Sequence, residues 1–324
     1  MNRTVLVTGT AGFIGGHVAT GLHEAGWTVT GVDQNPAAAG AWESITADAA
    51  DPTLLARITG GEFAVVVHQA AVSDTLAEDG ERLRWANATV PLRLARACAE
   101  SGTRLVYASS GSVYGVVPHG VSSRESDADD RGRCSGPLNA YAKSKLVLDQ
   151  SMLRRAAVFG LDCVGLRYTN VFGPGEESKG AMASILWQIV TAAAAGRPVR
   201  LFDDTLTAAR DYLPVQALVS TLMQLLDTPQ VAGVYNLGSG TAIRFDTLLG
   251  WCSEWAGAPV PMVAVPNPIR DRYQYWTCAD MRRLRAALPA LEPVSTEVIR
   301  HYARDLFHHT RAEARSAAEL VKSL

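Results

Sequence analysis

Short apolar runs alternate with longer helix-like segments along the first half of the chain. Five of these runs are rich in aliphatic and β-branched residues: Thr4–Thr8, Thr28–Asp33, Ala64–His68, Arg104–Ser109 and Asp162–Arg167. Strands buried on both faces lack strict apolar–polar alternation, so continuous runs are typical of a parallel sheet. Helical segments between the runs complete βαβ units. The pattern therefore predicts an α/β fold, a doubly wound parallel sheet with helices on both faces.

The pattern changes after about residue 170. Proline and glycine become more frequent, and the predicted strands are shorter: Arg197–Asp203, Asp211–Val215 and Val234–Leu237. We therefore predict two domains, residues 1–168 and 169–324. The second is a smaller α/β lobe that wraps the first and exchanges some strands and helices with it.

Two segments carry few large apolar residues. Val116–Pro137 is polar, and we expect a surface loop near the mouth of the site. The composition of Thr310–Leu324 predicts a peripheral helix.

Composition and charge narrow the function classes. The chain has 324 residues, 48% of them hydrophobic, and 30 basic residues against 32 acidic ones. This composition excludes a largely disordered protein and a strongly basic nucleic-acid binder. No apolar run reaches the ~20 residues that span a bilayer, and polar residues precede any signal-like region, so we expect no membrane partner. The five cysteines are scattered without CxxC pairs, which favours reduced cytoplasmic thiols over disulfides or a metal site: Cys98, Cys134, Cys163, Cys252 and Cys278.

A glycine-rich turn follows the first predicted strand. Gly9, Gly12 and Gly15 lie between that strand and a helix predicted over Gly15–Ala25. Such a turn lets backbone approach a pyrophosphate, and the helix N-terminus points free N–H groups at the phosphates. Asp33 ends the second strand, where a carboxylate can accept both hydroxyls of the adenosine ribose. The arrangement predicts a dinucleotide site.

The residues after Asp33 indicate which dinucleotide binds. No Lys or Arg occurs before Arg57, and a carboxylate repels a 2′-phosphate, so NAD is favoured over NADP. Asp48 is a candidate for holding the adenine amino group, and a helix-capping role for it is an open alternative.

A tyrosine and a lysine provide candidate acid–base chemistry. Tyr141 and Lys145 are four residues apart in a predicted helix and so lie on one face. We expect the nearby ammonium and a positive nicotinamide to stabilise the phenolate as a general base. Ser110, at the end of a predicted strand, is placed to hydrogen-bond the substrate oxygen. Each pattern also occurs in ordinary structural positions.

Motifs along almost the whole chain resemble the extended short-chain dehydrogenase/reductase family of NAD-dependent nucleotide-sugar epimerases and dehydratases. They are TGTAGFIG, HQAA, Asn87, SSGSVYG, YAKSK, LRYTNVFGP, RDYLPV and YNLGSG. The resemblance implies a Rossmann domain, a C-terminal nucleotide-sugar lobe and Ser110, Tyr141 and Lys145 as the catalytic triad. It implies further cofactor contacts at Phe13, Ile14, Ala70, Ala71 and Asn87.

Two longer segments are similar to ADP-glyceromanno-heptose 6-epimerases. They are Asn170–Ser184 and Asp271–Ala287. This resemblance implies that Lys179 is a second catalytic acid/base, which an epimerase needs when the transient ketone rotates about an exocyclic bond. The alternative for Lys179 is a surface cation paired with Glu176 or Glu177. The chain departs from these enzymes after Asp33, where they carry a lysine, and in Val116–Pro137.

Substrate contacts follow from charge and from the resemblance. Arg210 and Arg272 are candidates for the diphosphate, with Arg270 as a competitor. Asn170 is expected to contact the sugar phosphate, and Phe202 to pack on the base or in the core. We expect Asp211 to orient Arg210. His68 is expected to line the cofactor or to be structural.

The sequence thus predicts an NAD-dependent epimerase of a nucleotide-diphosphate sugar, most like a heptose C6 epimerase. An acidic pair that follows Ser110 in the family's 4,6-dehydratases is replaced here by Gly111 and Ser112, which argues against dehydration. The alternatives are a C4 epimerase of a UDP- or GDP-hexose or of a higher-carbon sugar nucleotide, and a non-catalytic NAD(P)-binding regulatory protein. The family resemblance also suggests a homodimer or larger homo-oligomer, formed through Leu83–Glu100 and the helix of Tyr141.

Overall fold

A seven-stranded sheet forms the centre of the larger lobe in the computed structural model, which describes residues 3–36, 42–74, 79–130 and 132–322. All its strands are parallel and follow the order β10-β6-β5-β4-β1-β2-β3. Their bounds are β1 (Thr4–Thr8), β2 (Thr28–Asp33), β3 (Glu43–Thr46), β4 (Val65–His68), β5 (Arg104–Ser110), β6 (Cys163–Tyr168) and β10 (Gly233–Leu237). The predicted doubly wound parallel sheet is confirmed.

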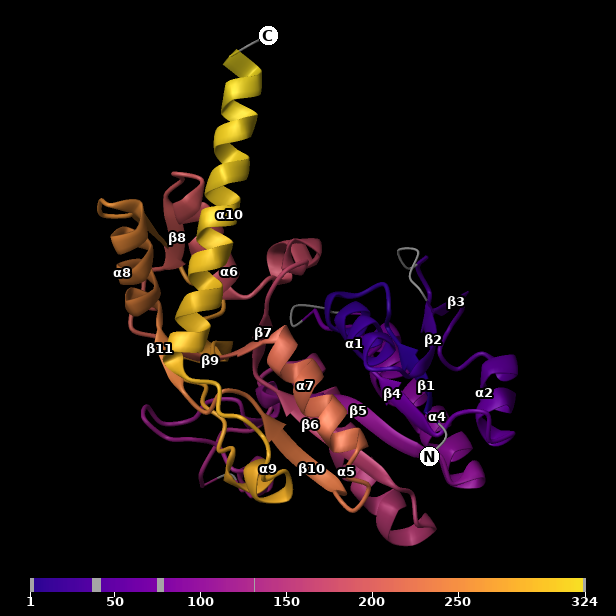
Figure 1. Ribbon diagram of the computed structural model, residues 1–324. Helices are drawn as coiled ribbons and strands as arrows, with labels where there is room; N and C mark the ends of the chain where they lie inside the picture. Colours follow the sequence, from indigo (N-terminus) through magenta and orange to yellow (C-terminus); the bar gives the residue numbers. More distant parts are fainter. Residues whose placement is uncertain (1–2, 37–41, 75–78, 131, 323–324) are drawn as a thin grey trace.

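Helices cover both faces of this sheet (Figure 1). Because side chains alternate along a strand, Val5 and Val7 of β1 face one core while Leu6 faces the other. The first core is covered by α1 (Phe13–Glu24), α7 (Val215–Leu226) and α9 (Arg282–Ala287). The second is covered by α2 (Pro52–Thr59), α4 (Val90–Ser101) and α5 (Ala140–Phe159). Helix α3 (Gly80–Arg84) and a π-helical turn at Trp85–Thr89 lead into α4.

Elements from the second half of the chain complete the large sheet. Strand β10 pairs with β6, and α7 packs beside α1. The chain therefore crosses between the lobes more than once.

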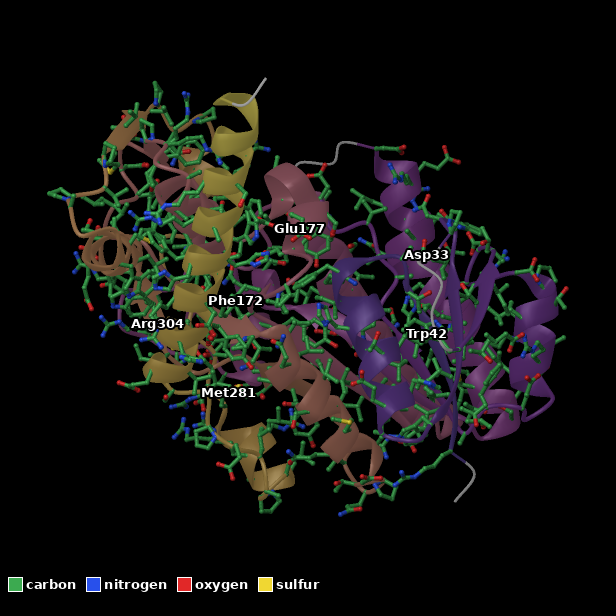
Figure 2. All side chains as sticks on the ribbon, turned by 45° about the horizontal axis from the view of Figure 1, so that its top comes forward. Asp33, Trp42, Phe172, Glu177, Met281 and Arg304 are labelled. Carbon is green, nitrogen blue, oxygen red and sulfur yellow. The ribbon has the colours of Figure 1, made fainter. Side chains whose placement is uncertain are left out.

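The smaller lobe has its own core. It contains a three-stranded sheet in the order β11-β9-β7 and a two-stranded sheet of β12 and β8. Their bounds are β7 (Asn170–Phe172), β8 (Val199–Phe202), β9 (Ala209–Pro214), β11 (Ala242–Arg244) and β12 (Met262–Val265), with helices α6 (Ile185–Ala194), α8 (Phe245–Ala256) and α10 (Thr296–Lys322). Figure 2 labels one member of each lobe's core, Phe172 in this lobe and Met281 in the first core of the larger lobe.

The prediction of a surface loop over Val116–Pro137 is wrong in part. The segment contains a 3₁₀ helix at Glu125–Asp129, and Val117, Ala128 and Cys134 are buried in a small separate core. Ser123 also forms a β-bridge with Ala279. Apolar residues spaced among charged ones are enough to pack this segment against α5.

The predicted helix at Thr310–Leu324 is the outer part of a longer one. Helix α10 begins at Thr296, and its first turns bury Ile299, Ala303 and Phe307 in the smaller lobe. The last turns extend away from the body (Figure 1). None of the helices in the described ranges is long and apolar enough to cross a membrane.

Candidate functional site

The glycine turn after β1 is held by its own close packing. Gly9 has a φ of +80°, and a Cβ there would lie 2.7 Å from the amide nitrogen of Ala70. A Cβ on Gly15 would lie 2.0 Å from the carbonyl oxygen of Gly9. Both positions therefore require glycine to form the turn itself.

The N-terminus of α1 is open to an anion. Gly12 is its N-cap and supplies no side-chain hydrogen bond, and the first turn, which begins with Phe13 and Ile14, contains no acidic residue. By contrast, the Asp51 side chain caps α2 and Asn139 caps α5. Uncapped N–H groups and the positive end of the helix dipole fit a pyrophosphate.

Two carboxylates follow the last two strands at one side of the sheet, Asp33 at the end of β2 and Asp48 just after β3. Asp33, labelled in Figure 2, accepts hydrogen bonds from the amides of Ala11 (3.1 Å) and Asn35 (2.9 Å). Burial acts to raise the pKa of Asp48, but hydrogen bonds from Trp85, the Ala50 amide and Gln34 outweigh it and lower this pKa. The helix cap considered for Asp48 is provided by Asp51 instead.

The loop after β4 is held by the side chain of Thr8, on the neighbouring strand β1. The hydroxyl of Thr8 accepts hydrogen bonds from the amides of Gln69 and Ala70, both at 3.1 Å, and is 2.8 Å from Nδ1 of His68. Burial, with a smaller contribution from the charge of Lys145, lowers the pKa of His68 to about 3. His68 is therefore a neutral, buried residue.

Asn87 uses its side chain to hold this loop. Its Oδ1 accepts from the Val72 amide (2.9 Å), and its Nδ2 donates to the Val72 carbonyl (2.9 Å) and the Ser144 hydroxyl (3.1 Å). The predicted cofactor residue thus connects the segment of Ala70 and Ala71 to α5. Its observed contacts are structural.

The proposed triad converges from two elements. Asn139 starts α5 by accepting from the Ala142 amide (2.8 Å), which sets Tyr141 and Lys145 one turn apart. Ser110, at the end of β5, is close enough to Tyr141 to influence the pKa of its hydroxyl. The Nζ of Lys145 lies 5.9 Å from the centre of the Tyr141 ring. The three residues are therefore brought together.

The sequence predicts that the Lys145 ammonium and a bound nicotinamide stabilise the Tyr141 phenolate. The groups of the chain alone do not lower the pKa of Tyr141. Burial raises this pKa, and the side chain of Ser110 acts in the opposite direction. The ammonium of Lys145 donates to the Ala108 carbonyl (2.9 Å). Burial lowers the pKa of Lys145 to about 8, against a smaller opposing effect of Asp149.

Lys179 lies between the lobes, on a 3₁₀ segment over Glu176–Met182. Its Nζ is 3.0 Å from Glu176 Oε1 and 5.4 Å from the centre of the Phe13 ring. Together with the chain from Ala71 to Asp74, Lys179 lines a pocket of about 530 Å³. The predicted pairing with Glu176 exists, but the carboxylate is buried and the pair is not a surface ion pair.

Arg210 and Phe202 meet around one aromatic ring. The guanidinium of Arg210 lies 4.9 Å from the centre of Tyr273, and Phe202 approaches the same ring edge-on at 5.8 Å. Arg272 is exposed beside this cluster, whereas Arg270 is paired with Asp203 and Asp204. Of the two competing arginines, Arg272 is the less engaged.

The expected role of Asp211 is wrong. Its carboxylate accepts hydrogen bonds from Ser239, from the amide of Gly240 (3.1 Å) and from the amide of Ala279 (2.9 Å), and in the described part of the chain it makes no hydrogen bond with Arg210. Asp211 therefore organises the turn after β10. Asn170 joins the same region through its Nδ2, which donates to the Asp211 carbonyl (3.0 Å).

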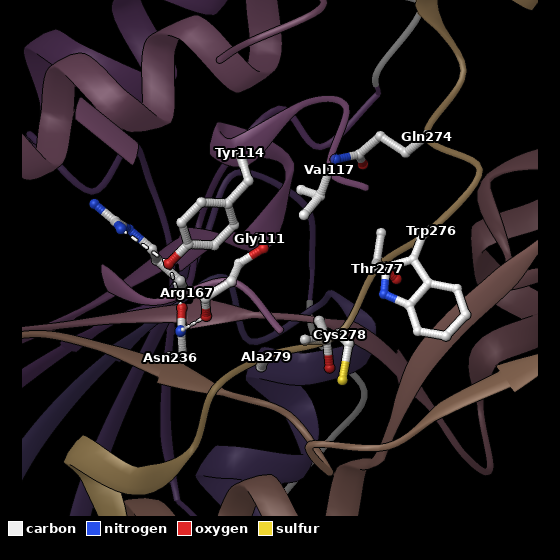
Figure 3. Close-up of a pocket in the computed structure, with 12 residues that line it drawn as sticks. Gly111, Tyr114, Val117, Arg167, Asn236, Gln274, Trp276, Thr277, Cys278 and Ala279 are labelled. Atoms are coloured by element: carbon white, nitrogen blue, oxygen red, sulfur yellow. Dashed lines mark hydrogen bonds between the residues drawn. The ribbon is translucent and has the colours of Figure 1, made fainter. Parts of the chain in front are cut away.

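A small cavity of about 20 Å³ lies beside Gly111, the residue that follows Ser110 at the end of β5 (Figure 3). Gly111 lines it on one side, and Trp276, Thr277 and Cys278 line it on the other. Tyr114, Asn236 and Arg167 also line this cavity, and the hydroxyl of Tyr114 donates to Asn236 and accepts from Arg167. These buried hydrogen bonds fix one wall of the site. They join residues far apart in the sequence, so no local motif reveals them.

Comparisons with known proteins agree with this geometry. The model of the NAD dependent epimerase/dehydratase family matches residues 5–238. The chain is 32% identical to the ADP-L-glycero-D-manno-heptose-6-epimerase of Thiobacillus denitrificans, over 89% of this chain and 93% of that protein. It is 31% identical to the enzyme of the same name from Brachyspira hyodysenteriae, over 87% and 91%.

Several solved structures share this fold, including an epimerase from Helicobacter pylori and one from Thermus thermophilus. The Helicobacter pylori ADP-L-glycero-D-manno-heptose-6-epimerase superposes with a TM-score of 0.82 and 26% identity, covering 96% of this chain and 97% of that one. The Thermus thermophilus UDP-glucose 4-epimerase, solved with NAD, has a TM-score of 0.80 and 27% identity, covering 94% and 99%. The resemblance found in the sequence is confirmed, and the chain belongs to the NAD dependent epimerase/dehydratase family of enzymes.

Proposed function

We propose that the protein is an NAD-dependent epimerase that inverts a hydroxyl-bearing carbon of a nucleotide-diphosphate sugar, most like C6 of a heptose. The observation that carries the proposal is the convergence of Ser110 and Tyr141 beside Lys145, at the carboxyl end of the same sheet as the glycine turn. In open α/β sheets this edge is where ligands bind.

Each triad residue has a separate task. Tyr141 takes the proton from the sugar hydroxyl, and Ser110 hydrogen-bonds the same oxygen. Because burial raises the pKa of Tyr141, the phenolate needs additional positive charge. NAD, when bound, supplies that charge on its nicotinamide and accepts and returns the hydride. Lys145 keeps its ammonium near the Tyr141 ring through its bond to Ala108.

Inversion needs the ketone to present its other face. At an exocyclic carbon, rotation about one bond moves the oxygen to a new position. Lys179, at the wall of the larger pocket, is the candidate proton donor there. A C4 epimerase that turns the whole ring can reuse Tyr141.

The proposed cofactor is NAD rather than NADP. Asp33 presents a carboxylate where the ribose hydroxyls are expected, and Asp48 is held ionised by its three donors. The first cation after Asp33 is Arg57, whose guanidinium is bound by Glu43 and Glu62. A 2′-phosphate would find a like charge at Asp33 and a cation already paired at Arg57.

The diphosphate is assigned to Arg210 and Arg272, the base to the vicinity of Phe202, and the sugar phosphate to Asn170. Arg210 is buried, and its guanidinium lies over the rings of Tyr273 and Phe245, which hold the guanidinium in one orientation. A planar guanidinium in a fixed orientation suits bidentate contact with phosphate oxygens.

We further propose a cytoplasmic homodimer or larger homo-oligomer. All five cysteines are free and buried. Helix α5 exposes Val147, Leu153, Val158 and Phe159, with the last two more than 60% exposed. Burying such side chains against a second copy removes them from water.

Substrate identity is tested by incubating the enzyme with ADP-, GDP- and UDP-activated sugars and following each carbon by NMR. Inversion at C6 of a heptose supports the proposal as stated, and inversion at C4 of a hexose supports the alternative. Lys179→Ala separates them further, because it cripples a two-base enzyme and spares a C4 epimerase with one base. Binding of NAD without turnover of any sugar would leave the regulatory alternative.

A further inference from the structure

Glu176 is a buried carboxylate to which the reaction outlined above gives no task. Its side chain is 0% exposed, although it lies in a segment whose neighbours Gly175, Glu177 and Ser178 are exposed. Buried carboxylates are costly unless charged or hydrogen-bonding partners surround them. The partners of Glu176 therefore indicate what it does.

Three donors bind this carboxylate. Oε1 accepts from Lys179 Nζ (3.0 Å) and from the amide of Ser184 (2.6 Å), and Oε2 accepts from the Ser184 hydroxyl (3.1 Å). Ser184 in turn caps α6 by accepting from the Trp187 amide (3.2 Å). The ammonium of Lys179 is thus connected to the start of a helix in the core of the smaller lobe.

The other side of Lys179 faces the larger lobe. Its ammonium lies over the ring of Phe13, in the first turn of α1. His17 of α1 is hydrogen-bonded to the carbonyl of Pro174 (2.8 Å), which docks the beginning of the same segment. Lys179 is 28% exposed and lines the pocket shared with Ala71–Asp74.

We propose that Glu176 is a positioning residue that fixes the ammonium of Lys179 at the pocket wall, a role that rests on the proposed function of Lys179 as the second proton donor. A lysine side chain has four rotatable bonds and many rotamers in solution. A proton donor works only within about 2.6–3.2 Å of its acceptor. A buried carboxylate that cannot leave its site restricts the ammonium to one place, ready for the rotated ketone.

The competing explanation is that Glu176 only closes the turn before α6. In that case the carboxylate would matter for stability through Ser184, and the position of Lys179 would be incidental. A measurement on Lys179 itself separates the two explanations.

The first test follows the reactivity of the Lys179 amine without any sugar. Wild type and Glu176→Gln are pulsed with acetic anhydride at one pH, and acetylation at Lys179 is measured by mass spectrometry relative to the exposed Lys143. We expect the ratio to rise several-fold in Glu176→Gln, because the amine loses its ionic partner and moves into solvent. Glu177→Gln, which changes the exposed neighbour labelled in Figure 2, is the matched control and leaves the ratio unchanged. An unchanged ratio in Glu176→Gln overturns the proposal.

The second test measures turnover. Glu176→Gln lowers kcat by about 10- to 100-fold, with a smaller change in KM, because misplacement of an acid–base group acts on the reaction step. Added to Lys179→Ala, the substitution causes no further loss, whereas a merely structural role would add its own loss. Glu176→Asp keeps the charge with a shorter reach and gives intermediate values, and it decides the question if Glu176→Gln does not fold. If the wild type turns over no sugar nucleotide, the proposed function fails, and the acetylation ratio alone decides whether Glu176 holds Lys179.

Discussion

The two lobes hold their functional side chains in different ways. In the larger lobe, backbone groups hold the catalytic lysine and the glycine turn: Lys145 donates to the Ala108 carbonyl, and Gly15 packs against the carbonyl of Gly9. In the smaller lobe, side chains hold side chains: Arg210 lies against Tyr273, and Lys179 is bound by Glu176. Backbone-built sites follow from the order of strands and helices, whereas side-chain clusters depend on tertiary packing.

This difference explains which predictions succeeded. Five central strands of the large sheet and the glycine turn follow from local pattern, because a buried parallel strand and a φ of +80° each restrict residue type. The pattern does not predict strand β3, because it is mostly exposed and has no apolar run. The partners of Asp211 come from residues 239–240 and 279, far away in sequence, so no spacing rule could reveal them. The burial of Glu176 depends likewise on Ser184 and α6.

The largest effect is expected in the larger lobe. Tyr141→Phe removes the hydroxyl that exchanges the proton, and turnover falls by about 10²- to 10⁴-fold. NAD binding, measured by calorimetry, remains, because the glycine turn and Asp33 are untouched. Tyr302→Phe, on α10, is the control and keeps wild-type turnover. Activity above a tenth of the wild type in Tyr141→Phe would remove this residue from the reaction.

The backbone-held lysine predicts a pH dependence of stability. Burial lowers the pKa of Lys145 from 10.5 to about 8, so between these values the unfolded chain binds more protons than the folded one. The free energy of unfolding contributed by Lys145 therefore rises as pH increases from about 8 to 10.5, by up to about 3 kcal/mol. Urea unfolding across this range should show a steeper rise in wild type than in Lys145→Met. Identical slopes would mean that burial does not shift this lysine.

The side-chain cluster of the smaller lobe predicts a binding defect. Arg210→Lys keeps the charge but loses the planar stack on Tyr273, and we expect KM for the nucleotide sugar to rise by about 10- to 100-fold. Arg272→Lys, at an exposed position, changes KM by less. Steady-state kinetics with the best substrate checks both, and an equal effect of the two variants would contradict the special role of the buried arginine.

The smallest effect concerns Asp211. Asp211→Asn destabilises the protein by about 1 kcal/mol for each donor that it leaves unpaired, because the amide cannot accept from all of them. Urea unfolding measures this loss, with the exposed Asp203→Asn as control. NAD affinity should not change, since the turn after β10 lies apart from the glycine turn; a loss of NAD affinity would show that the lobes are coupled through this carboxylate.

The most direct test of the central claim follows the inverted carbon in D₂O. Hydride that leaves the sugar and returns from the same bound cofactor does not exchange with solvent, so NMR of the product should show an inverted centre that still carries protium. Deuterium at that carbon would indicate that inversion proceeds by loss of a proton instead, and would contradict the roles assigned to NAD and Tyr141.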